Sequence, residues 1–200
     1  MNNIKKSLLI SFIVLILPFF INMYASVAEE ILEENNLDIT DINKQISEIT
    51  KAANSGDPES QFLLGEISLR NNNPPDHATA VYWFRIASES NHLKAQEMLG
   101  AHLFMGLGVP QDSYQASVWW LKAAHSGSVK AQASLGVLYA LGNGINKDLI
   151  ESYKWLSIAG KNGNEEAIMQ RDNSIALQMN AEEIREAQKR IKNFVNKSRD

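Results

Sequence analysis

The sequence of 200 residues contains no cysteine and carries no excess of basic residues. The missing cysteine excludes disulfide bonds, thiolate metal ligands and cysteine nucleophiles. The net charge is −4, from 19 basic and 23 acidic residues, and it argues against nucleic acid as a partner because phosphate binding needs a basic patch. The HExxH, GxSxG and SxxK motifs are missing too. We therefore expect no catalytic residue, cofactor or metal, and we do not expect an enzyme.

The first 28 residues differ in composition from the rest of the chain. Lys5 and Lys6 precede a long uncharged and mostly apolar run, which Pro18 interrupts late and which ends in small residues. This pattern predicts a signal peptide at 1–28, with the mature chain beginning near Glu29. The alternative is an uncleaved membrane anchor, since the run is long enough to cross a bilayer. We expect an exported protein, periplasmic or secreted, whose contact with membrane is limited to this segment.

A repeat of 36 residues dominates the remaining sequence. Each copy shares an aspartate, a tryptophan seven residues later, an alanine four residues after that, and a glycine in its first half. The recurring residues are Asp76, Asp112 and Asp148; Trp83, Trp119 and Trp155; Ala87, Ala123 and Ala159; and Gly65, Gly100 and Gly136, where the first spacing is one residue shorter. The apolar periodicity predicts a pair of helices in each unit. The predicted units are 58–91, 92–127 and 128–163, with first helices at 58–70, 93–105 and 129–141 and second helices at 76–89, 112–125 and 148–161.

Partial copies of the repeat flank the three units. Residues 41–57 match a second helix without its tryptophan, and they predict an N-terminal capping helix. Residues 164–195 predict a degenerate half repeat followed by a C-terminal capping helix. The acidic segment at 29–40 is expected to be flexible, and residues 196–200 form a tail. The predicted fold is all-α, an α/α solenoid of stacked antiparallel helix pairs.

The second and third units resemble the Sel1-like repeat. The resemblance rests on Ala95–Gly100, Gly106–Asp112, Trp119-Trp120 and Gly127, and on their counterparts in unit three. It implies a right-handed superhelix related to tetratricopeptide repeats, and an adaptor role in protein complexes. Bacterial members are often exported and act in the cell envelope or in host interaction. One exported subgroup, linked to β-lactam binding or hydrolysis, is rich in cysteine, which this sequence lacks.

The recurring residues have structural interpretations that we favour over functional ones. One tryptophan per unit, with an alanine four residues later on the same helix face, is typical of core packing rather than of a stacking platform. Gly100 and Gly136 lie in the middle of predicted helices, so we expect a neighbouring helix to cross there. Gly106-x-Gly108 is expected to form a turn rather than a phosphate loop, because no Walker motif follows.

The first helices of a solenoid line its concave side, so the residues on them that vary between repeats are candidate ligand contacts. They form one stripe per helix, and the alternative is that some of them pack between repeats. The candidate protein-binding residues are Glu59, Phe62, Glu66, Lys94, Glu97, Ala101, Met105, Lys130, Ala133, Val137 and Leu141. The stripes change from acidic to apolar along the chain, which suits an amphipathic helix or an extended peptide.

Two classes of function remain after the sequence analysis. We favour an exported scaffold or adaptor that binds a protein or peptide in its concave groove, in the bacterial cell envelope, as a monomer. The alternative is an envelope enzyme of the β-lactam-hydrolase type. A regulator of a cell-wall hydrolase, or a protein acting in host interaction, is a narrower version of the first class.

Overall fold

The computed structural model describes residues 39–70 and 74–197. The chain divides into two units, Met1–Ser47 and Glu48–Asp200, and the division falls inside helix α2 (Ile39–Asn54). The first unit contributes residues 39–47 to the description, and the helix pairs belong to the second unit. Outside the described residues lie the predicted signal peptide (1–28), most of the acidic segment (29–40) and most of the tail (196–200).

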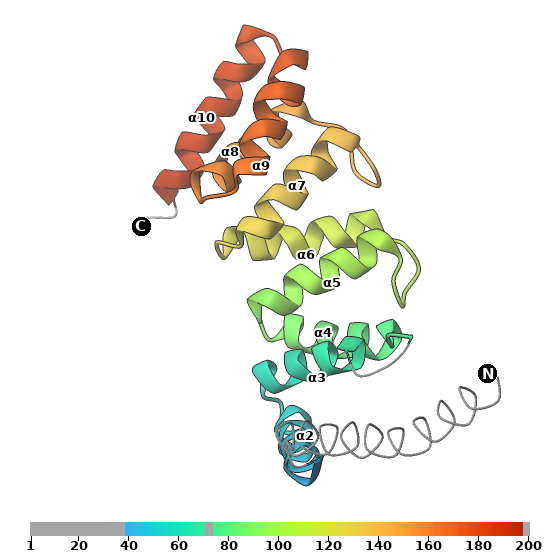
Figure 1. Cartoon of the computed structure of the whole chain (residues 1–200). Helices are drawn as coiled ribbons and strands as arrows, with labels where there is room; N and C mark the ends of the chain where they lie inside the picture. Colours follow the sequence, from blue (N-terminus) through green and yellow to red (C-terminus); the bar gives the residue numbers. More distant parts are fainter. Residues whose placement is uncertain (1–38, 71–73, 198–200) are drawn as a thin grey trace, which may run out of the picture. The chain divides into compact units, whose positions relative to one another are not determined.

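The second unit consists of helices that pack in successive pairs (Figure 1). The pairs are α3 (Pro58–Arg70) with α4 (His77–Glu89), α5 (Leu93–Met105) with α6 (Ser113–His125), and α7 (Val129–Leu141) with α8 (Leu149–Lys161). Each pair also contacts the next, since α4 packs against α5 and α6 against α7. Residues 39–70 and 74–197 contain no strand. The prediction of an all-α fold of stacked helix pairs is therefore confirmed.

The half repeat after α8 differs from a regular first helix. Helix α9 (Glu165–Gln170) has six residues and continues into a π-helical turn (Arg171–Ile175) and a 3₁₀ turn (Ala176–Gln178). Helix α10 (Ala181–Lys197) then packs against α8. The sequence predicted a degenerate half repeat at this place, and the structure shows that its first helix changes character after Gln170. In the observed arrangement, Ile175 and Met179 are buried together with Ala187 of α10.

Local sequence signals explain where the helices begin and end. Each of the three repeated aspartates caps the N-terminus of a second helix, because its carboxylate accepts backbone N–H groups at 2.9–3.0 Å. Asp76 accepts from Thr79, Asp112 from Gln115, and Asp148 from both Ile150 and Glu151. Such a cap stabilises a helix by about 1 kcal/mol. The first helices α5 and α7 end at Gly106 and Gly142, whose φ angles of 71° and 67° are left-handed and favour glycine.

The tryptophans pack as predicted in two of the three repeats. Trp119 is 8% exposed and Trp155 is 1% exposed, whereas Trp83 is only partly buried. Trp155 is the most deeply buried because Phe194 of α10 packs against its ring, with centroids 5.2 Å apart. The mid-helix Gly100 lies against the ring of Trp120, so the predicted close contact between helices is present.

Among the described residues, no helix combines the length and the hydropathy that a membrane span requires.

Candidate functional site

Three consecutive first helices, α5, α7 and α9, begin with equivalent capping residues. His92, Ser128 and Asn164 lie 36 residues apart, and each side chain accepts the backbone N–H three residues later, at 3.1, 3.0 and 2.9 Å. The cap fixes the first turn of each helix, because it satisfies an N–H group that has no partner inside the helix. The half repeat therefore keeps the register of the full repeats at its start, and α9 continues the row of first helices.

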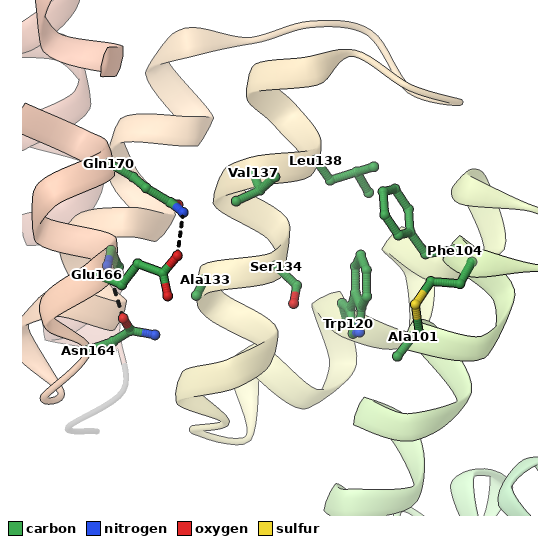
Figure 2. Close-up of a pocket in the computed structure, with 12 residues that line it drawn as sticks. Ala101, Phe104, Trp120, Ala133, Ser134, Val137, Leu138, Asn164, Glu166 and Gln170 are labelled. Atoms are coloured by element: carbon green, nitrogen blue, oxygen red, sulfur yellow. Dashed lines mark hydrogen bonds between the residues drawn. The ribbon is translucent and has the colours of Figure 1, made fainter. Parts of the chain in front are cut away.

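A cavity of about 350 Å³ lies across these three helices (Figure 2). Figure 2 shows α7 in the middle, with Asn164, Glu166 and Gln170 on one side and Phe104 and Trp120 on the other. The lining residues are Ala101, Phe104 and Met105 of α5, Trp120 of α6, Ala133, Ser134, Val137 and Leu138 of α7, and Asn164, Glu166, Ala167 and Gln170 at α9. Ligand pockets have this kind of lining, mostly apolar with a few polar groups, and volumes from about 300 Å³ upward.

Four of the candidate residues meet in this cavity, namely Ala101, Met105, Ala133 and Val137. Met105 is 56% exposed, and a flexible thioether at a cavity edge adapts to differently shaped partners. A fifth candidate, Leu141, lines an adjacent cavity of about 200 Å³ together with Val137. The structure thus brings together the apolar candidates of repeats two and three.

The candidates of repeat one do not belong to this cavity. Phe62 is 4% exposed and lies in the hydrophobic core, with its ring 5.7 Å from that of Phe84, so it is not available to a partner. This corrects its assignment to the groove. Glu59 contacts His92 at 2.9 Å, and Glu66 pairs with Arg70 at 3.4 Å.

The polar candidates of repeats two and three also lie outside the cavity. Glu97 joins two repeats, because its carboxylate accepts the hydroxyl of Ser128 and its carbonyl accepts Nε1 of Trp120 at 3.2 Å. The ammonium group of Lys94 lies 6.0 Å from the ring centroid of Phe62. Lys130 is exposed. The contacts of Glu97 are therefore structural, in line with the alternative that some candidate residues pack between repeats.

Sequence reasoning missed the wall that α9 contributes. It also missed Phe104, Trp120, Ser134 and Leu138 as lining residues. A signal for the α9 wall was present, since the 36-residue register that gives Lys130 and Ser134 continues to Glu166 and Gln170. The predicted groove covers only the first helices of the three full repeats and therefore leaves out the half repeat.

The polar wall of the cavity consists of acceptor groups and amides. Nε2 of Gln170 donates to a carboxylate oxygen of Glu166 at 3.2 Å, and Oδ1 of Asn164 accepts the N–H of Ala167. Among the described residues, no group of three His, Cys, Asp or Glu side chains has a geometry that could hold a metal ion. The arrangement can bind apolar and hydrogen-bonding groups.

Two histidines far apart in the sequence meet outside the cavity. Nδ1 of His77 lies 3.4 Å from Nε2 of His102, between α4 and α5. His102 is 3% exposed, and its Nδ1 donates to the carbonyl of Met98 at 2.8 Å. Burial lowers the pKa of His102 below its ordinary value of 6.5, and nearby His77 lowers it further. Spacing along the sequence did not predict this pair.

Comparisons with known proteins agree with the geometry. A model of the Sel1 repeat matches residues 58–92, 93–128 and 129–164. The chain is similar to a protective antigen of uropathogenic Escherichia coli strains that displays an SLR fold, with 33% identity and a TM-score of 0.70 over 76% of this chain. It is also similar to a Sel1 repeat protein from Oxalobacter formigenes, with 30% identity and a TM-score of 0.60 over 63% of this chain. The chain covers 33% and 52% of those two proteins, respectively. No curated protein gives a significant match.

Proposed function

Because the chain belongs to the Sel1 repeat family, we propose that it is a non-catalytic scaffold that binds a segment of a partner protein across α5, α7 and α9. The observation that carries this proposal is the cavity that these helices share, with an apolar lining of accessible side chains such as Met105. Monomeric proteins seldom leave large apolar surfaces uncovered unless the surface binds something. A helix pair alone could not build this cavity, because its walls come from three successive units.

We also propose that the scaffold acts outside the cytoplasm, in the cell envelope or beyond it. The signal-peptide pattern of residues 1–28 supports this location, and the E. coli protein that resembles the chain is a protective antigen. Cell fractionation with N-terminal sequencing tests this part. We expect the envelope or medium to contain a chain that starts near Glu29, and an intact chain confined to the cytosol would contradict the proposal.

Site-specific photocrosslinking in cells tests the groove. A photoreactive amino acid at Val137, which lines both cavities, should give a discrete crosslinked product with a partner protein. The matched control carries the same amino acid at Leu121, a 38% exposed residue on α6 that lines neither cavity. Products that are equal at the two positions, or stronger at Leu121, would show that binding occurs elsewhere.

A further inference from the structure

The cavity across α5, α7 and α9 has an apolar side and an acidic side, and these come from different helices. Phe104, Trp120 and Val137 provide carbon surface, whereas Glu166 and Gln170 provide oxygen and amide groups on α9 (Figure 2). An occupant that satisfies both sides needs an apolar group and a polar group close to each other. A purely apolar occupant would leave the polar side without partners, which is unfavourable when water is displaced.

The carboxylate of Glu166 has no cationic partner within the described part of the chain, and its hydrogen bond comes from the neutral amide of Gln170. The cation that follows α9 in the sequence, Arg171, is already paired, since it binds both carboxylate oxygens of Asp172 at 2.7 and 2.9 Å. The guanidinium of Arg171 also lies over the ring of Tyr153. Glu166 is therefore available to a positive charge from outside the chain.

The charge at the position of Glu166 differs from that in the two preceding repeats, whereas repeat one also has a glutamate there, Glu59. The register positions equivalent to Glu166 hold Lys94 and Lys130 in the two preceding units, and neither lysine lines the cavity. The sign of the charge therefore reverses between α7 and α9, which both line this cavity. A partner with a basic residue is attracted at this position, and an acidic partner is repelled.

The apolar surface continues beyond the main cavity. Val137 and Gln170 line both this cavity and the adjacent one of about 200 Å³, so the two cavities are neighbours along α7 and α9. Met105, Leu141 and Leu177 lie 36 residues apart and are 56%, 60% and 78% exposed. Two adjacent cavities suit two side chains from one continuous segment, as when a short amphipathic peptide binds in a groove.

We propose that the groove recognises a peptide segment that carries two apolar side chains and an adjacent lysine or arginine. The apolar side chains occupy the two cavities that share Val137, and the basic side chain pairs with Glu166. This inference rests on the proposed function and specifies the chemistry of the partner. An acyl chain and a second copy of this chain are the competing occupants.

Selection from a phage-displayed library of random linear peptides tests the proposal. The native chain should enrich peptides that combine two apolar residues with a nearby lysine or arginine. The Glu166→Lys variant should instead enrich peptides in which aspartate or glutamate replaces the basic residue. The matched control is Glu165→Lys, which makes the same charge change on an adjacent exposed residue that does not line the cavity, and it should select the native motif.

The selected consensus peptide then allows a quantitative measurement by fluorescence anisotropy. Loss of a partly exposed ion pair should weaken binding of the peptide to Glu166→Gln by about two- to fivefold, which corresponds to roughly 0.4–1 kcal/mol and lies within the range typical of such pairs. The effect should shrink as salt is added. Val137→Gln should weaken binding of every selected peptide, while thermal melting shows whether this variant remains folded.

Several results would overturn the inference. These are a selection that yields no binding peptide, motifs without basic residues, or the same motif from native and Glu166→Lys protein. Displacement of the consensus peptide by a fatty acid, without any charge preference, would assign the groove to an acyl chain. Concentration-dependent dimerisation that Val137→Gln abolishes would assign it to a second copy. If crosslinking at Val137 still captures a partner protein, the proposed function stands and only the basic-peptide chemistry fails.

Discussion

Substitution of Gly100 tests the contact on which the stacking of helices depends. Gly100 is buried in the middle of α5, and the ring of Trp120 from α6 lies directly against it. A Cβ atom added at Gly100 would approach Trp120 Cδ1 to 2.5 Å, which is far inside van der Waals contact. Trp120 is 6% exposed and its Nε1 donates to the carbonyl of Glu97, while its ring also lines the cavity across α5, α7 and α9.

The expected magnitude follows from opposing effects. Replacing glycine by alanine in a helix stabilises it by about 1 kcal/mol. Overpacking a filled core costs about 1–3 kcal/mol, and displacing Trp120 Nε1 from its hydrogen bond costs about 1 kcal/mol more. Gly100→Ala should therefore lower the free energy of unfolding by about 1–3 kcal/mol. Gly100→Leu has similar helix propensity and more volume, so its loss should be larger.

Urea unfolding followed by circular dichroism and tryptophan fluorescence measures both variants. The control is the same Gly100→Ala change in a Trp120→Ala background, where the space is empty and alanine should be neutral or stabilising by up to about 1 kcal/mol. The reasoning would be refuted if Gly100→Ala stabilised the native chain by the full helix-propensity gain. That result would show that the Trp120 ring does not pack on Gly100 in solution.

The sequence predicted the helix pairs because their signals are local and repeated. An aspartate before an apolar stripe and a glycine after one determine where a helix begins and ends, whatever the rest of the fold does. The mid-helix glycines also indicated a close helix crossing. Their packing partners occupy equivalent positions, one residue after each repeated tryptophan, but the side chain there changes from Phe84 to Trp120 to Leu156.

The groove was predicted only in part, because sequence register does not determine burial. Phe62 and Ala133 occupy equivalent positions in repeats one and three, but Phe62 is buried whereas Ala133 lines the cavity. The aromatic ring of Phe62 is large enough to pack against both Phe84 and the capping His92, with centroids 5.7 and 4.8 Å away. A methyl group at Ala133 leaves that space empty, and the space becomes part of the cavity.

The remaining predictions concern the C-terminal cap and the buried histidine. Phe194→Ala should lower the free energy of unfolding by about 2 kcal/mol, which is less than the roughly 3–5 kcal/mol expected for a fully buried ring because Phe194 is only partly buried. The same substitution should shift the fluorescence of Trp155 to the red, since Phe194 packs against its ring. An unshifted spectrum would contradict this packing. Burial lowers the pKa of His102 in the folded state, so the contribution of this histidine to the free energy of unfolding should be fully present above pH 6.5. The free energy of unfolding should fall as the pH drops below 6.5, because the unfolded chain then binds a proton that the folded chain does not bind as readily. His102→Leu introduces the residue that repeat three has at the equivalent position, Leu138. This variant should show a flatter dependence of the unfolding free energy on pH between about pH 5 and pH 7.5, a range that extends about 1 pH unit or more to either side of the ordinary histidine pKa. A native profile that already lacks this slope would show that His102 is protonated without cost, and that neither its burial nor the neighbouring His77 holds it neutral.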